Sequence, residues 1–425
     1  MRQATRALTV LAEIDPAARA TLEQRLANIA AGTAGDDAFA PDQLPDTHFT
    51  RFVIVDDPRG ELPALLAWES NHDGDQDDYL VAVARSAPEI DQLLACCHGY
   101  PAAGVADLDA WLRWIRPRCR RAAAFYTGYR GVPRSAVVND REVREELRNI
   151  LDDEDRRALR DLSRHELQRR LFERVRHRRP ALDLSPGTSA RWWQLQLQRV
   201  LAGIGAVVLL PFALVIALPW YLALRRRESS DLATAYTRPI TLAADVRAME
   251  DRGSQNQLTH LVELKPGWFR LATLWLVLKL VDVLARIYAV HGNLGGITAI
   301  HFARWVILRD KRPVAVRRHR LLFFSNYDGS WESYLGEFVD RAAPWLSAVW
   351  SNTRGFPATR CLFFGGAEDE AAFKQWAREH QLATQLWWSG AADSTVQNIR
   401  DDTWIRERLD RGLSDAEVLE WTRRL

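Results

Sequence analysis

Alternating apolar and polar residues predict strands near both ends of the chain. The segments 8–14 and 258–264 alternate in this way, and each is followed by a stretch of helical periodicity, at 17–30 and at 268–290. A strand with the pattern His-Phe-x-Arg comes next, followed by a turn and a third strand that ends at Ser-Asn. Both regions therefore begin with the order strand, helix, strand, strand.

Two more helices and a final strand follow in each region. After Asp328-Gly-Ser, apolar residues recur at helical spacing from Trp331 to Val339, so one face of this helix is apolar. A further helix is expected at 108–115 and at 368–379, and the last strand is rich in aromatic residues. The predicted order is β-α-β-β-α-α-β, which is a ferredoxin-like module with one added helix.

The two regions also share sequence, which indicates an internal repeat. Five of nine positions are identical between 8–16 and 258–266. The later matches keep their order along the chain, and each matched glycine precedes an Arg-Glu-x-Leu by the same offset. These matches are His48-Phe-Thr-Arg51 with His301-Phe-Ala-Arg304, Ser70-Asn-His-Asp-Gly74 with Ser325-Asn-Tyr-Asp-Gly329, and Gly128 with Gly390. We therefore predict a duplication.

The duplication predicts a fold class and a set of boundaries. We expect an α+β protein in which two ferredoxin-like repeats pack as a pseudo-twofold α+β barrel, with an inserted membrane-anchoring helical segment. The predicted parts are repeat 1 at 1–151, a charged helical connector at 152–190, a membrane segment at 191–227, a linker at 228–257, and repeat 2 at 258–425 with the apolar helix 268–290.

The region between the repeats contains a run that is typical of a membrane segment. Val200–Leu224 has 25 residues without a charge, bounded by Arg199 and by Arg225-Arg226-Arg227. Pro211 and Pro219 favour a bent hairpin that enters and leaves the bilayer on one side, and a true span is the alternative. Because arginines flank both ends, the positive-inside rule predicts an inner (cytoplasmic) membrane protein with both repeats facing the cytoplasm.

The second apolar helix, 268–290, differs from a membrane span. Lys279, Asp282 and Arg286 fall within about 60° of one another on a helical wheel, so they form one polar stripe. This pattern predicts a helix that lies in the membrane interface or packs under a sheet.

Composition narrows the class of function. The 425 residues carry 57 Lys and Arg against 55 Asp and Glu, a balance that excludes nucleic-acid binding through bulk charge. Apolar residues make up 47%, enough for real cores. The four cysteines show no zinc-binding spacing and no disulfide framework, which fits a reducing compartment.

His48 and His301 occupy matched positions on matched strands. Strand alternation puts His301 on one face with Trp305, and His48 on one face with Phe52. If that face points into the barrel, the two histidines can ligate a metal or haem, or act as an acid–base pair. The alternative is that each histidine at a strand end bonds a neighbouring carbonyl or carboxylate.

The matched Ser-Asn-x-Asp-Gly strings also have two interpretations. In the structural one, Asn and Gly make a turn and the aspartate caps the next helix. In the functional one, Asp73 and Asp328 are general acid–base groups at the barrel mouth, and Asn71 and Asn326 orient a ligand.

Arg51 and Arg304 need a partner if they are buried, because an unpaired internal charge is costly. The structural choice is a carboxylate of the same module, Glu13 or Glu263 on the first strand. The functional choice is a bound acidic ligand. Trp305 and Tyr334 complete the set of residues predicted to bind it.

The duplicated ferredoxin-like plan resembles the dimeric α+β barrel superfamily, which includes the dye-decolorising peroxidases and chlorite dismutases. The resemblance is architectural and covers residues 8–151 and 258–425. It implies a haem cofactor and a catalytic aspartate in a Gly-x-x-Asp-Gly motif. The nearest string here is Ser325-Asn326-Tyr327-Asp328-Gly329, which lacks the first glycine. The resemblance therefore implies the catalytic role only for Asp328 and, through the repeat, for Asp73.

Three functions follow as hypotheses. The first is a membrane-anchored cytoplasmic barrel that binds a hydrophobic or acidic, lipid-like small molecule. The second is a haem-dependent, peroxidase-like oxidoreductase, and the third is a non-catalytic membrane scaffold. The lipid bilayer is the expected partner, and a barrel closed within one chain leaves a homo-oligomer optional.

Overall fold

The computed structural model is described here for most of the chain. The described residues are 5–35, 37–153, 162–185, 192–229, 250–251, 253–287, 296–313 and 316–425.

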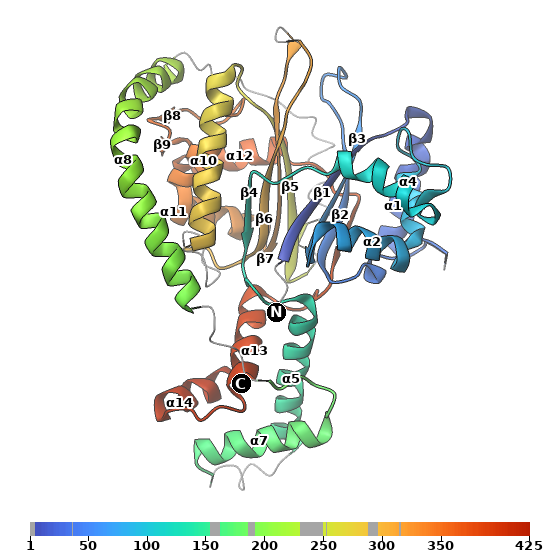
Figure 1. Ribbon diagram of the computed structural model, residues 1–425, viewed down its shortest axis with the longest axis vertical. Coiled ribbons are helices and arrows are strands. Elements are labelled where there is room, and N and C mark those ends of the chain that lie inside the picture. Colours follow the sequence, from blue (N-terminus) through green and yellow to red (C-terminus); the bar gives the residue numbers. More distant parts are fainter. Residues whose placement is uncertain are drawn as a thin grey trace.

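Two four-stranded antiparallel sheets form the centre of the molecule, so the α+β class is confirmed (Figure 1). In the first sheet the order is β1 (Thr5–Glu13), β3 (Leu65–Asp73), β2 (Thr47–Val55) and β10 (Leu386–Ser389). In the second sheet the order is β4 (Ala124–Thr127), β6 (Ile300–Leu308), β7 (Arg320–Asp328) and β5 (Gln255–Glu263). A further pair, β8 (Thr359–Arg360) and β9 (Phe364–Gly365), lies outside these sheets.

The last strand of each half lies in the sheet of the other half. Strand β4, from the first half, pairs with β6, and strand β10, from the second half, pairs with β2. A glycine follows each exchanged strand: Gly128 donates its N–H to the carbonyl of His301 at 2.7 Å, and Gly390 donates to that of His48 at 2.8 Å. The predicted module order does not contain this exchange, which depends on pairing between distant segments.

An apolar layer fills the space between the two sheets. Residues of β1, β2 and β3 meet residues of β5, β6 and β7 there. The members are Leu11, Val53, Val55, Ala67, Leu261, Val306, Leu308, Leu322 and Phe324. Because side chains alternate along a strand, the opposite face of each sheet is free to bury helices.

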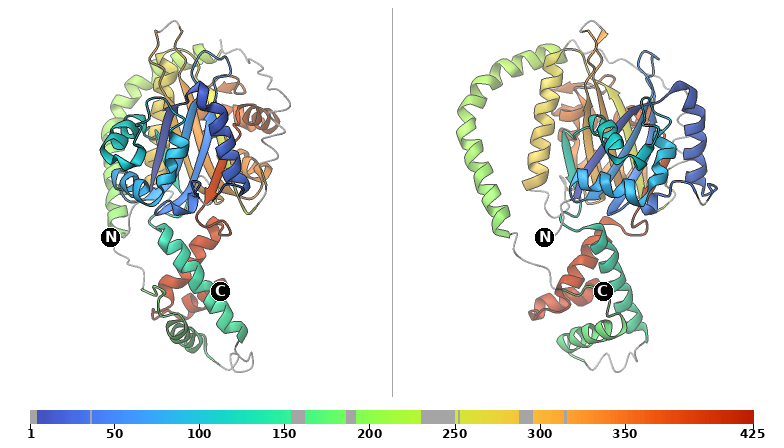
Figure 2. Two further views of the ribbon diagram at one scale, coloured as in Figure 1. Left: turned by 90° about the vertical axis from the view of Figure 1, so that its right-hand side faces the viewer. Right: turned by 45° about the vertical axis from the view of Figure 1, so that its right-hand side comes forward.

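Helices cover the outer faces of both sheets (Figures 1 and 2). On the first sheet these are α1 (Arg19–Ala31), α2 (Gln76–Ser86), α3 (Asp91–Leu94) and α4 (Leu108–Ile115). On the second they are α10 (Trp268–Ile287), α11 (Trp331–Trp350) and α12 (Glu370–His380). Helix α10 runs along the edge strand β4, where Asp282 Oδ1 accepts the N–H of Phe125 at 3.2 Å. The polar stripe of this helix therefore serves packing at a sheet edge.

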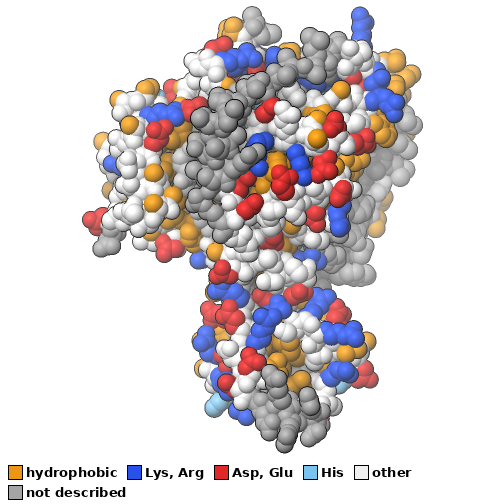
Figure 3. Space-filling view, turned by 180° about the vertical axis from the view of Figure 1, so that it is seen from behind, with side chains coloured by type: hydrophobic (Ala, Val, Ile, Leu, Met, Phe, Trp, Pro, Cys, Tyr) orange, Lys and Arg blue, Asp and Glu red, His pale blue; other side chains and the backbone are white. Residues whose placement is uncertain are grey.

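Four of the helices in the described residues form a base below the sheets, and it has an apolar core of its own (Figure 1). They are α5 (Arg134–Asp153), α7 (Arg164–Arg178), α13 (Val396–Arg408) and α14 (Asp415–Arg424). Two reciprocal ion pairs join α5 to α13, Arg144–Asp402 at 2.7 Å and Arg406–Asp140 at 2.8 Å. Acidic and basic side chains are interspersed over the outside of the base (Figure 3).

Helix α8 (Trp192–Glu228) corrects the membrane prediction. It continues through Pro211 and Pro219, so the predicted hairpin turn is wrong. A proline removes one backbone hydrogen bond, and here the chain bends (Figure 1) without ending the helix. Within the residues that the structure describes, no helix has both the length and the apolar character needed to cross a bilayer. A function that depends on membrane anchoring is therefore not supported.

The C-terminal end of α8 is fixed to the second half. The carboxylate of Glu228 accepts the N–H groups of Cys361 at 2.9 Å and Leu362 at 2.7 Å. Both of these residues have positive φ, a conformation that turns successive N–H groups toward one acceptor. Trp220 also packs against Phe269 of α10, with ring centroids 4.5 Å apart.

Candidate functional site

Two histidine–aspartate pairs lie where the sheets meet the base. His48 Nε2 is 3.1 Å from Asp73 Oδ1, and His301 Nε2 is 2.7 Å from Asp328 Oδ1. The second carboxylate oxygen of each aspartate accepts a backbone N–H at 2.7 Å, from Arg134 at the start of α5 or from Val396 at the start of α13. Each pair therefore fixes the start of a base helix to a strand end.

These aspartates cap different helices from the predicted ones. The helix that follows Asp73 is capped by Asp75, and the helix that follows Asp328 is capped by Ser330. Asp73 and Asp328 instead accept the first N–H of α5 and of α13, more than sixty residues further along the chain, and the N-cap of α13 itself is Thr395. Although burial opposes it, the hydrogen bond from His48, with those from Arg134 and Thr5, holds the pKa of Asp73 below its ordinary value.

A β-bulge changes the direction of each histidine. The register shifts between Thr47 and Phe49, and again between Ile300 and Phe302. A bulge inserts one extra residue, so simple alternation fails there. The histidines therefore do not lie with Phe52 and Trp305, which was the prediction; those two residues belong to the layers under the helices.

An aromatic cluster encloses the histidines instead. Tyr129 lies between them, with its ring centroid 5.6 Å from that of His48 and 5.7 Å from that of His301. Phe302 packs on His48 at 5.3 Å, and Phe49 packs on His301 at 5.1 Å. Burial, together with the negative charges of Asp328 and Asp73, raises the pKa of Tyr129 well above its ordinary value, so its hydroxyl stays protonated.

This geometry does not fit the haem that the superfamily resemblance implies. An axial histidine needs a free ring nitrogen facing open space. Nε2 of both His48 and His301 is held by a carboxylate, and their side chains are 3% and 0% exposed. Nδ1 of His301 has no hydrogen-bond partner in the described part of the chain, but Phe49 and Tyr129 pack against that ring.

Arg51 and Arg304 form a charged network between the sheets. Both reach Glu69: Arg51 Nε lies 2.8 Å from one carboxylate oxygen and Arg304 Nη2 lies 2.6 Å from the other. Each arginine also donates to a carbonyl of the opposite sheet at 2.9 Å, that of Ser325 for Arg51 and that of Ser70 for Arg304. Burial lowers the pKa of both guanidinium groups, that of Arg304 to about 10.

The predicted carboxylate partners of these arginines are wrong. Glu13 and Glu263 lie near the protein surface, with side chains 50% and 18% exposed. Glu69 lies on the third strand instead, and its side chain is 1% exposed. Glu69 is the register partner of Arg51 on the neighbouring strand, and Arg304 reaches it from β6 of the other sheet.

The other predicted ligand-binding residues are also engaged within the protein. The side-chain oxygens of Asn71 and Asn326 accept hydrogen bonds from Arg304 and Arg51. The hydroxyl of Tyr334 bonds Ser325 at 2.6 Å, and Trp305 packs against Phe323 with centroids 4.8 Å apart. The structure thus collects the ten predicted residues at the sheet interface and beneath the helices, and none of them lines the pocket described next.

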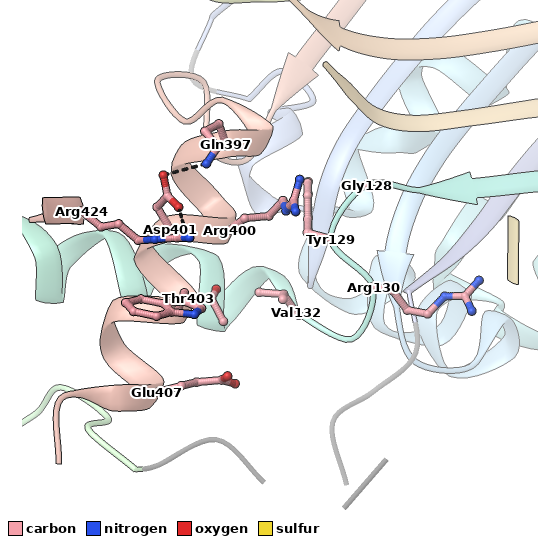
Figure 4. A pocket seen from close by; sticks show the side chains of 11 residues that line it. Gly128, Tyr129, Arg130, Val132, Gln397, Arg400, Asp401, Thr403, Glu407 and Arg424 are labelled. Carbon is pink, nitrogen blue, oxygen red and sulfur yellow. Dashed lines mark hydrogen bonds and ion pairs between the residues drawn. The ribbon is translucent and has the colours of Figure 1, made fainter. Parts of the chain in front are cut away.

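A pocket of about 310 Å³ lies at the joint between the sheets and the base (Figure 4). The turn from Gly128 to Val132 forms one wall, and one face of α13 forms the other. Arg424 of α14 reaches in from the side, where it pairs with Asp401 at 2.7 Å. Gln397 also bonds Asp401, at 2.8 Å. The lining residues are Gly128, Tyr129, Arg130, Val132, Gln397, Arg400, Asp401, Thr403, Trp404, Glu407 and Arg424.

Two donors in this pocket lack acceptors among the residues that the structure describes. The guanidinium of Arg400 makes no hydrogen bond or ion pair there, and it points toward Tyr129 (Figure 4). The hydroxyl oxygen of Thr403 is buried and also has no hydrogen-bond partner. Since Asp401 neutralises Arg424, the charge of Arg400 is left without a nearby counter-ion on its own wall.

Sequence reasoning missed this pocket. Gln397, Arg400, Trp404 and Glu407 recur at spacings of three, four and three residues, so they share one helical face. That spacing could have suggested a polar face, but only the tertiary fold brings the turn around Tyr129 against it.

Comparisons with family models, with curated proteins and with solved structures found no match for this chain.

Proposed function

We propose that this protein binds a small organic anion, a carboxylate, in the pocket at the joint. The observation that carries the proposal is Arg400, a cation without a counter-ion among the described residues, beside the buried and unsatisfied hydroxyl of Thr403. Arg400 is partly exposed to the pocket, and a bound carboxylate would give its guanidinium a charge-assisted hydrogen-bond partner.

The shape of the pocket supports a small ligand. Its volume of about 310 Å³ lies at the lower end of the range for small-molecule sites. The rings of Tyr129 and Trp404 supply apolar surface, while Arg400 supplies a directed polar contact. The proposed site therefore differs in place and in chemistry from the lipid-binding barrel that the sequence predicted.

The proposal concerns binding and not a reaction. The four residues predicted to be catalytic, His48, Asp73, His301 and Asp328, use their polar atoms to hold strand ends and helix starts together. Tyr129 separates both histidine rings from the pocket that it lines. Their proposed role is to position the turn that forms one wall of the site.

We also propose that the two halves are copies of one ferredoxin-like module and close as a pseudo-twofold α+β barrel. The support is that matched residues make matched contacts: the exchanged strands, the two histidine–aspartate pairs, the two arginines that cross between the sheets, and the reciprocal ion pairs of the base. The resemblance to the dimeric α+β barrel superfamily is proposed on the same ground.

Isothermal titration calorimetry with the full chain tests the binding proposal. Octanoate is the probe, because its carboxylate suits Arg400 and its alkyl chain suits the aromatic walls. We expect Arg400→Gln to weaken octanoate binding about tenfold or more, since a charge-assisted hydrogen bond is lost.

Arg169→Gln is the matched control. It removes the same charge from an exposed position on α7, away from the pocket, and should leave octanoate binding unchanged. If octanoate does not bind the wild-type chain, or if both variants bind it equally well, the proposal is wrong.

A further inference from the structure

Most of the large apolar side chains that are exposed in the described residues lie on two neighbouring helices, α8 and α10. Both helices lie on the outer side of the second sheet (Figures 1 and 2). An exposed apolar surface of this extent marks an interaction site. Its members are Leu197, Val200, Ile204, Val208, Val215, Ile216, Leu218, Tyr221 and Leu222 on α8, and Trp268, Trp275, Leu276, Leu280 and Val283 on α10.

Helix α10 has apolar side chains on its outer side as well as on its inner side. Leu274 and Leu278 are buried in the core beneath the second sheet. Leu276 and Leu280, which project from the other side of the helix, are 56% and 45% exposed. A surface helix usually presents polar residues to water on its outer side, and here the polar stripe runs only along one edge of it. The outer side of α10 is therefore expected to meet a further apolar surface.

Helix α8 of the same chain leaves that outer side open. It contacts α10 at Trp220, whose ring centroid lies 4.5 Å from that of Phe269. Beyond this contact α8 bends away from α10 (Figure 2). Apolar side chains of α8, with Val208 and Val215 among them, are 60% and 77% exposed. Both helices therefore offer apolar surface to a partner.

The matched helix of the first half has no such surface. Helix α1 follows the first strand of its half, as α10 follows β5. The exposed residues of α1 are small or polar, with Thr21, Glu23 and Gln24 among them. The module itself therefore does not require an apolar outer side, and the one on α10 serves a contact that belongs to the second half alone.

The area of the apolar surface suits a dimer. The fourteen side chains are 44–77% exposed. At this exposure each of them offers roughly 60–100 Å² of apolar surface. Together they supply at least the roughly 800 Å² that each partner buries in an interface of standard size.

A second copy of the chain carries the helix that can cover α10. The run Val200–Leu224 has 25 residues without a charge, so packing it against α10 buries no unpaired charge. In a dimer with twofold symmetry the same contact forms twice, and each copy both gives a helix and receives one. We infer that the protein forms a homodimer in which α8 of each copy packs against the outer side of α10 of its partner.

Sedimentation velocity of the full chain in detergent-free buffer, over a range of concentrations, tests the inference. The wild-type chain should sediment with twice the mass of one copy. Ile204→Glu on α8 and Leu280→Arg on α10 should each weaken the dimer about a hundredfold or more, because each variant places a charge in both copies of the contact. Both positions are exposed in one copy, so the fold should be kept, and circular dichroism checks this.

A control and a mixture make the test specific. Thr21→Arg places a charge on the exposed side of the matched helix α1 and should leave the dimer unchanged. An equimolar mixture of the Ile204→Glu and Leu280→Arg proteins should form dimers at concentrations where neither forms them alone. In the mixed dimer one contact keeps both wild-type residues, and the other places a glutamate on α8 opposite an arginine on α10.

Several results would overturn the inference. The wild-type chain could remain a monomer at every concentration, or it could bind phosphatidylcholine vesicles as a monomer, in which case lipid covers the surface. Assemblies larger than a dimer would also contradict it, because a twofold contact closes at two copies. A dimer that survives both single variants uses another surface. If the mixture restores no dimer, α8 does not meet α10 of the partner.

Discussion

The turns that follow the two exchanged strands have the same residues where they contact the sheets. They differ at their rims, which are the residues of the turn and of the facing helix that lie around the pocket in one half. Gly128 and Gly390 each approach a carbonyl of the neighbouring strand, and each turn leads into a helix whose first N–H is accepted by an aspartate bonded to a histidine. The shared glycines, aspartates and histidines are also identical between the two matched segments of the sequence. They hold the strands, the helices and the two sheets together.

The rims differ because only one of the two turns forms the pocket. Counted from the matched glycines, Tyr129 corresponds to Ala391, Arg400 to Val138, and Trp404 to Glu142. The residues that maintain the fold thus occur twice, and the residues that line the proposed site occur once. Two kinds of residue differ between the halves here. One kind lines the proposed binding pocket, and the other is a buried charge, Glu69, that the fold contains once.

Glu69 is the clearest case of a charge that occurs once, and its replacement should have the largest effect on stability. Its matched residue is Phe324, whose ring lies 5.4 Å from the guanidinium carbon of Arg51. Glu69→Leu leaves two buried arginines without a carboxylate, so we expect the free energy of unfolding to fall by about 3–5 kcal/mol. Urea unfolding followed by circular dichroism measures the change.

Phe324→Leu is the matched control for Glu69→Leu, because it changes the same position of the other half without removing a charge. Its expected cost is under about 1.5 kcal/mol. If the two variants lost equal free energies of unfolding, the backbone carbonyls alone would satisfy the arginines. The carboxylate of Glu69 would then add no net stability.

His72 and Asp402 should give opposite pH dependences. Burial lowers the pKa of His72 to about 4, and its ring stacks on Tyr79 as Tyr327 stacks on Tyr334. Below the unfolded pKa of about 6.5 the unfolded chain binds the extra proton, so stability is lost as pH falls from 6.5 to about 4, by about 3 kcal/mol. His72→Tyr, which copies the matched residue, should remove this loss.

Asp402 acts in the reverse direction. Burial raises its pKa to about 6, against the effect of Arg144, and Asp140 and Asp401 add to the rise. The folded protein then binds the extra proton, so this group contributes stability below the unfolded pKa of about 3.9 that is lost as pH rises to about 6. Asp402→Asn mimics the protonated acid and should raise stability at neutral pH by about 1–3 kcal/mol, with no gain at pH 4.

Thermal unfolding of both variants from pH 4 to pH 7 separates the two groups. The His72→Tyr protein should lose stability as pH rises from 4 to 6, because Asp402 remains. The Asp402→Asn protein should gain stability over the same interval, because His72 remains. Parallel pH profiles for the two variants would contradict both assignments.

The two glycines should respond alike, with a smaller effect. A Cβ atom at Gly128 would lie 2.2 Å from the carbonyl oxygen of Ile300, and one at Gly390 would lie 2.6 Å from that of Thr47. Alanine at either position forces the exchanged strand away from its neighbour, at a cost of about 1–3 kcal/mol, with the larger loss at Gly128. The melting temperatures of the two variants test this. If the melting temperature fell for one variant only, the two exchanged strands would not be held in the same way.

Local pattern and the matches between the two halves of the sequence predicted the α+β class and many of its elements. The start of each half, strand, helix, strand, strand, follows from periodicity, but the structure adds α3 between α2 and α4 and the pair β8–β9 between α11 and α12. Periodicity and sequence matches can both be read directly along the chain.

The features that were missed depend on contacts between distant segments. The bulges at His48 and His301 turn those side chains, and alternation cannot reveal an inserted residue. The exchange of β4 and β10, the reach of Glu69 to two arginines, and the apposition of Tyr129 with α13 all join residues far apart in the chain. The predicted site residues were therefore the repeated ones, which serve the fold.

Arg400→Val should have the smallest effect on stability and is the most direct test of the difference between the rims. It places on α13 the residue that occupies the matched position, Val138, on α5. Arg400 makes no ion pair with any described residue, so its loss removes no stabilising contact, and the free energy of unfolding should stay within about 0.5 kcal/mol of the wild-type value. Octanoate binding should nevertheless be lost, because the pocket then has a valine where the carboxylate needs a cation. Urea unfolding and calorimetry on the same preparation measure both quantities, and a stability loss comparable to that of Gly128→Ala would place Arg400 among the residues that serve the fold.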